Sequence, residues 1–234
     1  MTFKFAVRTI AKRHGLHATF MPKPTTGENG SGMHINCMLR DIDGKNIFYD
    51  EKNELGLSKT AYYFIGGILK HIRGMSLITN PLVNSYKRLV SGFEAPVFIG
   101  WSLKSKSQIL RIPSSRGEKT KIELRSPDSS ANPYLVLATI LAAGLDGIKN
   151  KIYPPKNMEE NLNNLTKTEL TTRGVTLLPG NLDEAVHAFE EDPFLSQVLG
   201  SDFALRYAQM KKSEWEDYIK QVTDWEIDRY MYRI

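Results

Sequence analysis

The chain has 234 residues, of which 41% are hydrophobic and 24% charged, and this composition is that of a folded protein able to bury a core. Lysine and arginine exceed the acidic residues by five, a mild excess that suits small anions, and no nucleic-acid-binding signature accompanies it, so we expect no nucleic-acid partner. Cys37 is the only cysteine and the most apolar stretch, Tyr134 to Leu145, is too short to span a bilayer, so we expect a cytoplasmic protein with no disulfide and no membrane partner.

The amino-terminal part of the sequence predicts one helix and then a turn-rich connection. Apolar residues recur at helical spacing from Phe3 to Ala11, and Gly15 follows as a C-cap. Residues 17–22 have the composition of a short strand. The stretch GENGSGMH, residues 27–34, then places three glycines directly before a histidine. Because ordering a glycine costs more backbone freedom than ordering any other residue, this stretch predicts a turn or a close backbone approach.

A hairpin and a long helix are predicted next. Residues 33–41 and 46–50 have strand composition and flank the turn sequence DIDGKN, so we expect them to pair. Ser58 can cap a long helix that ends at Thr79, with apolar residues along one face.

The middle of the sequence predicts three strands and a buried helix. Asn132 and Pro133 are a cap and first-turn pair that begins a helix ending at about Ile148. The segments before it are apolar or alternating, and we expect antiparallel strands at 96–102, 107–113 and 121–127.

The rest of the chain predicts a polar excursion and then helices only. Residues 150–180 indicate an exposed loop or weak helix, and the chain is helical from Asn181 onward. Asn181 with Glu184 resembles a capping box, and Ser201 can begin a later helix. Because mixed strands precede a helical tail, this order predicts an α+β fold rather than alternating βαβ units.

His34 is the first candidate for chemistry. A lone histidine in a strand is most often structural, so a structural role and a metal-binding role both stay open. The neighbouring glycines would let main chain near Asn29 and Gly30 approach a ligand closely, and the Asn29 amide offers both a donor and an acceptor. The alternative is an ordinary hairpin turn.

A second candidate is the pair Glu123 and Arg125 in KIELRSPD. In a strand, residues two apart point to the same face, while Leu124 between them points into the core. The pair could be a surface ion pair of little energetic value. If that face lines a cleft, Glu123 could bind a metal and Arg125 a carboxylate or phosphate, whereas Asp128 is expected to cap the next turn.

Cations recur between residues 87 and 121. They are Lys87, Arg88, Lys104, Lys106, Arg111, Arg116, Lys119 and Lys121. They could protect solvated strand edges, or they could line a pocket that stabilises charge in phosphoryl transfer. Glu94 lies in the loop LVSGFEAP, where a closing flap could present a base. The sequence contains no P-loop, dinucleotide fingerprint, serine elbow or HExxH motif.

Several long motifs, in order along nearly the whole chain, resemble glutamine synthetase of the bacterial class I kind. They are HATFMPKP, NGSGMH, NSYKRLV with GFEAP, LRIP, IELRSPDSSANPYL and the tail EWEDYIKQVTDWEIDRYM. The resemblance implies the glutamine synthetase/guanidino kinase-like catalytic fold, a curved antiparallel sheet or half-barrel with flanking helices. It also implies ATP-dependent condensation of L-glutamate with ammonia through γ-glutamyl phosphate, with Mg²⁺ or Mn²⁺ as cofactor.

Carried over position by position, the resemblance implies a role for each matching residue. His34 and Glu123 match metal ligands. Glu94 matches a flap carboxylate that shields the acyl phosphate from water and helps to deprotonate ammonium. The implied catalytic residues are Glu94, Arg88 and Arg125; the implied glutamate-binding residues are Asn29, Gly30, Arg88, Glu94, Lys106 and Arg125; and the implied nucleotide-binding residues are Asn36, Met38, Lys106, Arg111 and Lys121.

Three positions depart from the family pattern. Lys106 stands where the family usually has an arginine, and lysine lacks the planar bidentate fork of a guanidinium group. Met38 stands where a serine would face the nucleotide, and Ser91 replaces a proline of the flap. Residues 153–175 lack the tyrosine segment that is adenylylated in one class I subgroup. These departures leave open a γ-glutamyl amine or polyamine ligase, or a non-catalytic regulatory paralogue that binds glutamine.

The resemblance also implies a missing portion. Family members carry a small β-grasp domain and two carboxylate-bearing strands ahead of the matching region. We therefore expect residues 1–234 to be a single domain, the carboxy-terminal part of the catalytic domain. We expect it to be inactive alone, because one imidazole and one carboxylate cannot hold two metals. Full-length members form two stacked six-membered rings, so the resemblance implies a dodecamer for the full-length protein.

Overall fold

The computed structural model describes residues 1–92 and 95–233. Its helices are α1 (Thr2–Arg13), α2 (Lys59–Thr79), α3 (Val83–Arg88), α4 (Pro133–Asn150), α5 (Lys167–Thr172), α6 (Leu182–Glu191), α7 (Pro193–Leu199), α8 (Ser201–Tyr218) and α9 (Asp224–Tyr230), with short 3₁₀ turns η1 (Gly117–Lys119) and η2 (Leu162–Asn164). Its strands are β1 (Ile35–Cys37), β2 (Phe98–Ser102), β3 (Gln108–Arg111), β4 (Ile122–Leu124) and β5 (Thr176–Leu177). The predicted α+β class is confirmed.

The five strands form one mixed sheet in the order β1-β4-β3-β2-β5. Of the three strands predicted to be antiparallel, β3 and β4 are so paired, but the prediction is wrong for β2–β3, which run parallel. The pairs β1–β4 and β2–β5 are also antiparallel. The connection between these two strands does not form a tight hairpin turn. Instead, the backbone N–H groups of Leu103 and Lys104 donate to the carboxylate of Glu159 at 2.8 and 3.0 Å, so the chain is held away from β2 before it re-enters the sheet.

The core is built around α2, which packs against α4, α6 and strand β2. As predicted, Ser58 caps this helix, its Oγ accepting from the Ala61 N–H at 3.1 Å. Contact with α4 is between backbones. A Cβ added at Gly67 would lie 2.0 Å from the carbonyl oxygen of Ala143, so only glycine permits this approach. Asn132 caps α4 as predicted, through a 3.0 Å bond from the Tyr134 N–H.

Two predicted strand regions near the amino terminus are wrong or shorter than expected. Residues 17–22 contain no strand, and the expected hairpin is reduced to β1 and isolated bridges at Arg40–Asn46 and Tyr49–Leu57. The side chain of Asn46 explains part of the difference. Its Nδ2 donates to the Thr120 carbonyl at 2.7 Å, so this residue joins the chain to the η1 region instead of extending a ladder.

The carboxy-terminal half is largely as predicted. Helices α6 to α9 follow Asn181, and the polar excursion contains a short helix and a 3₁₀ turn. It also contributes β5 to the sheet edge and a fully buried Leu162 to the core, neither of which was expected. The capping box at α6 is half formed. Asn181 accepts from the Glu184 N–H at 2.8 Å, but the Glu184 carboxylate accepts from Gly180 N–H.

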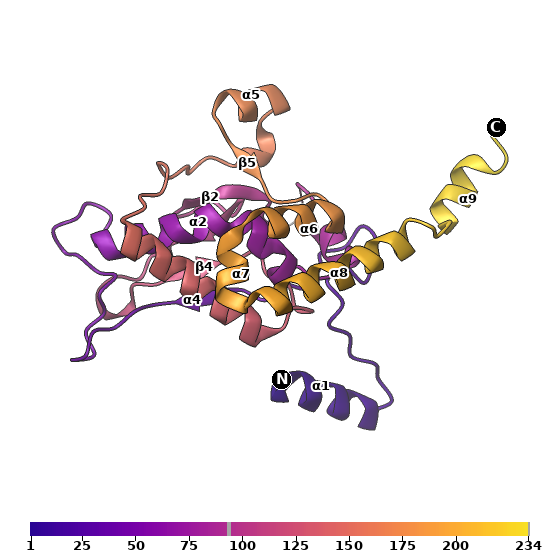
Figure 1. Ribbon diagram of the computed structural model, residues 1–234, viewed down its shortest axis with the longest axis horizontal. Coiled ribbons are helices and arrows are strands. Elements are labelled where there is room, and N and C mark those ends of the chain that lie inside the picture. Colours follow the sequence, from indigo (N-terminus) through magenta and orange to yellow (C-terminus); the bar gives the residue numbers. More distant parts are fainter. Residues whose placement is uncertain (93–94, 234) are drawn as a thin grey trace.

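Helices α1 and α9 lie at the margins of the molecule, α1 at the lower edge and α9 at the right, apart from the sheet and from α2 (Figure 1). Neither contains a buried residue. Within the described part of the chain, no helix combines the length and apolar character needed to cross a membrane.

Candidate functional site

One face of the sheet gathers the charged residues singled out in the sequence. Asn36 on β1 and Arg111 on β3 are each registered directly opposite Glu123 on β4, so the three side chains share a face. Because side chains alternate along a strand, His34 and Arg125 lie on the same face two residues away. The residue between, Leu124, is 1% exposed and faces the core.

The imidazole and the carboxylate predicted to meet are adjacent. His34 Nδ1 lies 3.3 Å from Glu123 Oε1. The other carboxylate oxygen, Oε2, is 2.6 Å from Arg111 Nε and 3.9 Å from Arg125 Nε, yet neither contact has the alignment of a hydrogen bond. Burial and the nearby guanidinium of Arg125 lower the pKa of His34, against the opposing pull of Glu123. The imidazole is therefore neutral near pH 7, the form that binds metals.

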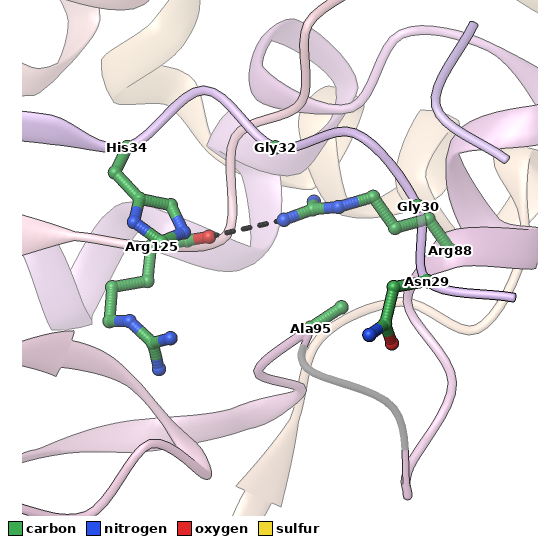
Figure 2. Close-up of a pocket in the computed structure, with 7 residues that line it drawn as sticks. All are labelled: Asn29, Gly30, Gly32, His34, Arg88, Ala95 and Arg125. Carbon is green, nitrogen blue, oxygen red and sulfur yellow. Dashed lines mark hydrogen bonds between the residues drawn. The ribbon is translucent and has the colours of Figure 1, made fainter.

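The glycine-rich loop closes one side of a cavity of about 440 Å³. It is lined by Asn29, Gly30, Gly32, His34, Arg88, Ala95 and Arg125. Figure 2 shows the loop passing along the wall while the Arg125 side chain points into the hollow opposite Asn29 and Ala95. A Cβ at Gly30 would lie 2.3 Å from the Pro22 carbonyl oxygen, and one at Gly32 would lie 2.7 Å from Arg88 Nη2. The glycines therefore serve close approach, as expected.

Arg88 is a fixed cation in the cavity wall. It ends helix α3 and is 4% exposed. Its Nη1 donates to the Ser126 carbonyl at 2.8 Å and its Nη2 to the Arg125 carbonyl at 3.4 Å (Figure 2). Burial lowers the pKa of Arg88 and Asp128 opposes this shift, but a guanidinium group stays protonated at any physiological pH.

A second cavity of about 720 Å³ adjoins the first through Asn29. It is lined by Asn29, Gly92, Lys104, Ser105, Lys106, Ser107, Glu159, Asn161 and Asn163. Lys106 therefore belongs to this cavity, although its backbone carbonyl accepts from Arg125 Nη1 at 2.6 Å. Sequence reasoning missed Glu159 and the two asparagines that follow it. The available signal was the asparagine-rich composition of the 150–180 excursion.

The remaining candidates are placed as follows. Asn36 lies on the face of Glu123, directly opposite it in the β1–β4 register. Met38 directly follows β1 and is 40% exposed, and Lys121 directly precedes β4. Asp128 is buried and its Oδ1 accepts from the Ser130 N–H at 2.9 Å, so it caps the turn as predicted. Glu94 lies outside the described residues.

His34 and Glu123, which the resemblance implies are metal ligands, lie together on this face. Among residues 1–92 and 95–233, no group of three or more histidine, cysteine, aspartate or glutamate side chains is arranged to hold a metal ion. An imidazole and a carboxylate are both groups that can bind a metal ion, and this pair offers two such donors.

Comparisons with known proteins agree over nearly the whole chain. The sequence profile of the family described as "Glutamine synthetase, catalytic domain" matches residues 1–230. The chain is 53% identical over 231 residues to a glutamine synthetase of Clostridium saccharobutylicum, covering 99% of this chain and 52% of the relative. It is 48% identical over 231 residues to a glutamine synthetase of Thermotoga maritima, with the same shares covered. The chain thus spans about half the length of these curated relatives.

Solved structures give the same result. A structure described as GmaS in complex with ADP superposes with a TM-score of 0.88 at 41% identity, over 98% of this chain and 53% of that one. Another, described as GmaS without ligand, gives a TM-score of 0.84 at 40% identity, over 99% and 52%.

Proposed function

The chain belongs to the glutamine synthetase catalytic-domain family, and from this premise we propose that its first cavity binds L-glutamate for ATP-dependent ligation to ammonia. In this reaction a γ-carboxylate oxygen of glutamate attacks the γ-phosphorus of ATP and releases ADP. Ammonia then attacks the γ-carbonyl carbon, loses a proton and expels phosphate to leave glutamine. The chain would supply the glutamate-binding and nucleotide-facing parts of that site.

The observation that carries the proposal is the convergence of Arg88 and Arg125 with the His34–Glu123 pair around one cavity of about 440 Å³. A dicarboxylate substrate needs a fixed positive charge for the end that does not react, and buried Arg88 supplies one. The end that reacts gains negative charge as the phosphoryl group transfers, and Arg125 on the sheet face is positioned to stabilise it.

Close main-chain approach explains the loop contacts. With no side chains at Gly30 and Gly32, the backbone of the loop can lie against the substrate. We assign Asn29 and Gly30 to glutamate binding. We assign Asn36, Met38, Arg111 and Lys121 to the nucleotide, because Asn36 and Arg111 are registered opposite Glu123 and Met38 and Lys121 adjoin the ends of β1 and β4. Lys106 is assigned to both ligands because it lies beside Asn29 in the adjoining cavity, and Glu94 is assigned as the base that removes a proton from ammonium.

The residues present fit one side of a divalent metal site. Glu123 Oε2 is buried without a hydrogen bond, and the neutral Nδ1 of His34 lies beside the same carboxylate. His34 and Glu123 would therefore hold Mg²⁺ or Mn²⁺. When bound, such an ion neutralises charge on phosphoryl oxygens. One imidazole and one carboxylate would not hold the two metals that the resemblance implies, so we propose that the chain alone does not turn over.

A related ligase that uses an organic amine is the second candidate. The similar solved structures are described as GmaS rather than as glutamine synthetase. Lys106 and Met38 depart from the family pattern at positions assigned to substrate and nucleotide. Comparing ammonia, methylamine and putrescine as acceptors separates these two functions.

The test has a binding arm and a turnover arm. Calorimetry with L-glutamate should show binding by the chain. An Arg125→Met variant should weaken it at least tenfold, whereas Arg206→Met, which alters an exposed arginine paired with Asp202, should leave it unchanged. The turnover arm joins this chain to the remaining half of the Clostridium relative. Glutamate-dependent ADP formation that requires ammonia supports the proposal. Absence of glutamate binding contradicts the assignment of the first cavity. Turnover by the isolated chain in a γ-glutamyl transferase assay contradicts the proposal that the chain alone is inactive.

We extend the proposal to assembly and location. Apolar side chains are exposed on and beside α9, among them Trp225 at 63% and Tyr232 at 88%. Such surfaces mark interaction sites, which supports a homo-oligomer, with a dodecamer expected for the full-length protein. A chain whose only cysteine is Cys37 suits the reducing cytoplasm.

A further inference from the structure

The segment that precedes the glycine-rich loop lacks regular structure, yet it forms a wall against the loop. Residues 16–31 contain no helix or strand. The carbonyl oxygen of Pro22 nevertheless accepts from the Ser31 N–H at 2.8 Å, and it lies where a Cβ of Gly30 would otherwise be. The position of Gly30 in the cavity therefore depends on what holds Pro22 in place.

Prolines on both sides limit how this segment can be held. Pro22 and Pro24 have no N–H, so Lys23 offers the only backbone donor across residues 22–24. Because Lys23 precedes a proline, its backbone is also biased toward an extended conformation. An extended segment with one donor cannot form a strand ladder. It can be fixed by a side chain that pairs with both polar groups of Lys23.

Asn84 on α3 makes that pair of contacts. Its Oδ1 accepts from the Lys23 N–H at 2.7 Å, and its Nδ2 donates to the Lys23 carbonyl at 3.0 Å. A carboxamide presents a donor and an acceptor side by side, which is the arrangement that a neighbouring strand would present. One side chain thus satisfies both backbone groups of Lys23 across 61 residues of sequence.

The same helix also holds the loop from its other side. Arg88 lies four residues after Asn84, so the two side chains occupy one face of α3. The Arg88 side chain packs against Gly30 and Gly32, and its guanidinium donates to the Ser126 carbonyl. Helix α3 is itself anchored, because the Val83 N–H donates to Glu214 on α8 at 3.4 Å.

We propose that Asn84 is a positioning residue that fixes the glycine-rich loop, and so sets the affinity of the first cavity for L-glutamate. The part concerning glutamate rests on the proposed function. Asn84 does not line either cavity, so its effect is on substrate affinity and not on the chemical step.

Hydrogen–deuterium exchange on the isolated chain tests the positioning directly. The Ser31 amide reports the contact with Pro22, and amides of α2 such as Ile68 report global opening. In Asn84→Ala the Ser31 amide should exchange about tenfold faster relative to Ile68, which corresponds to about 1.4 kcal/mol. Asn84→Asp keeps the acceptor and loses the donor, so its Ser31 exchange should fall between those of the wild type and the alanine variant.

Asn181→Ala is the matched control. Asn181 also makes two side-chain hydrogen bonds, but they cap α6, far from the loop in sequence. This variant should lower the urea midpoint without changing the ratio of Ser31 to Ile68 exchange. If Asn84→Ala fails to fold, the exchange ratio of Asn84→Asp tests the positioning role instead. An Asn84 variant whose Ser31 exchange ratio equals that of Asn181→Ala would overturn the proposal.

Calorimetry with L-glutamate supplies the functional readout. The dissociation constant should rise about tenfold in Asn84→Ala and stay unchanged in Asn181→Ala. If the exchange ratio rises while glutamate affinity is unaltered, the positioning holds but its role in affinity is refuted. If the wild-type chain itself does not bind glutamate, the proposed function fails, and the exchange result still decides whether Asn84 fixes the loop.

Discussion

His71, on the buried helix α2, should make the stability of this protein depend on pH. Its Nδ1 lies 2.8 Å from an oxygen of Asp192 and its Nε2 lies 3.0 Å from an oxygen of Asp146. A carboxylate only accepts hydrogen bonds, so both ring nitrogens must donate and the imidazole must be protonated. The ring is 4% exposed and stacks on Phe194 with centroids 3.9 Å apart. This cation joins α2 to α4 and to the start of α7.

The direction of this pH dependence follows from the pKa shifts of His71 and Asp146. Burial opposes the charge, but the hydrogen bonds to Asp192 and Asp146 outweigh it and raise the pKa of His71. The folded state then holds a proton that the unfolded state has lost, so stability falls as pH rises above about 6.5 and through the folded-state pKa. The His71 and Lys70 hydrogen bonds lower the pKa of Asp146 despite its partial burial, so stability is also lost in acid, below about pH 4.

The magnitude follows from the two contacts. Hydrogen bonds to charged groups contribute about 1.5–3 kcal/mol each, and both carboxylates keep about a fifth of their side-chain surface exposed, which places the sum near the lower end. His71→Gln should therefore lower the free energy of unfolding by about 3 kcal/mol at pH 6. The deficit should shrink steadily as the wild type loses its proton at higher pH.

Urea unfolding from pH 5.5 to 9 measures how the difference in unfolding free energy between the wild type and His71→Gln changes with pH. The contributions of the other titrating groups cancel in this comparison. His187→Gln is the control, because His187 lies on the exposed side of α6. A deficit for His71→Gln that stays constant across the range would refute the protonated-imidazole interpretation. A deficit that grows as pH rises would show that the predicted direction of the pH dependence is wrong.

Three further outcomes are expected. Gly67→Ala should cost about 3 kcal/mol or more in urea unfolding, because its Cβ would meet α4 backbone. Gly100→Ala should cost under about 1 kcal/mol, because its Cβ would meet the flexible end of Met158 and lie at ordinary contact distance from the side chain of Gln108; equal costs would contradict this packing. Gly32→Ala should displace the Arg88 guanidinium and weaken glutamate binding about tenfold in calorimetry with little loss of stability. Burial raises the pKa of Cys37 to about 11, so its reaction with an aromatic disulfide should still accelerate about tenfold per pH unit at pH 9; a plateau by pH 9 would exclude that shift.

Local rules predicted what lies on one strand or at one helix end. Alternation along a strand placed Glu123 and Arg125 on one face, as the structure has them. Caps at Ser58 and Asn132 fixed where the two core helices begin. These features depend on neighbours within about four residues, so a single sequence contains them.

Contacts across long stretches of sequence could not be predicted in this way. The carboxylate of Glu159 accepts hydrogen bonds from the turn between β2 and β3 from 55 and 56 residues away, and it also lines the second cavity. Residues 17–22 have strand composition but form no strand, and the backbone groups of the next residue, Lys23, bond to Asn84, which lies 61 residues away. Strand propensity needs a ladder partner, and composition does not say whether one is present.

The two arginines that line the first cavity are held in place by different elements of the fold. Arg125 is placed by strand pairing, and its position is therefore tied to the sheet. Arg88 is placed by α3, whose first N–H is bound by Glu214 of α8. The bond from Arg88 to the Ser126 carbonyl joins the two parts at 2.8 Å. The spacing of the two charges thus depends on the docking of a helix from the carboxy-terminal tail, far in sequence from either arginine.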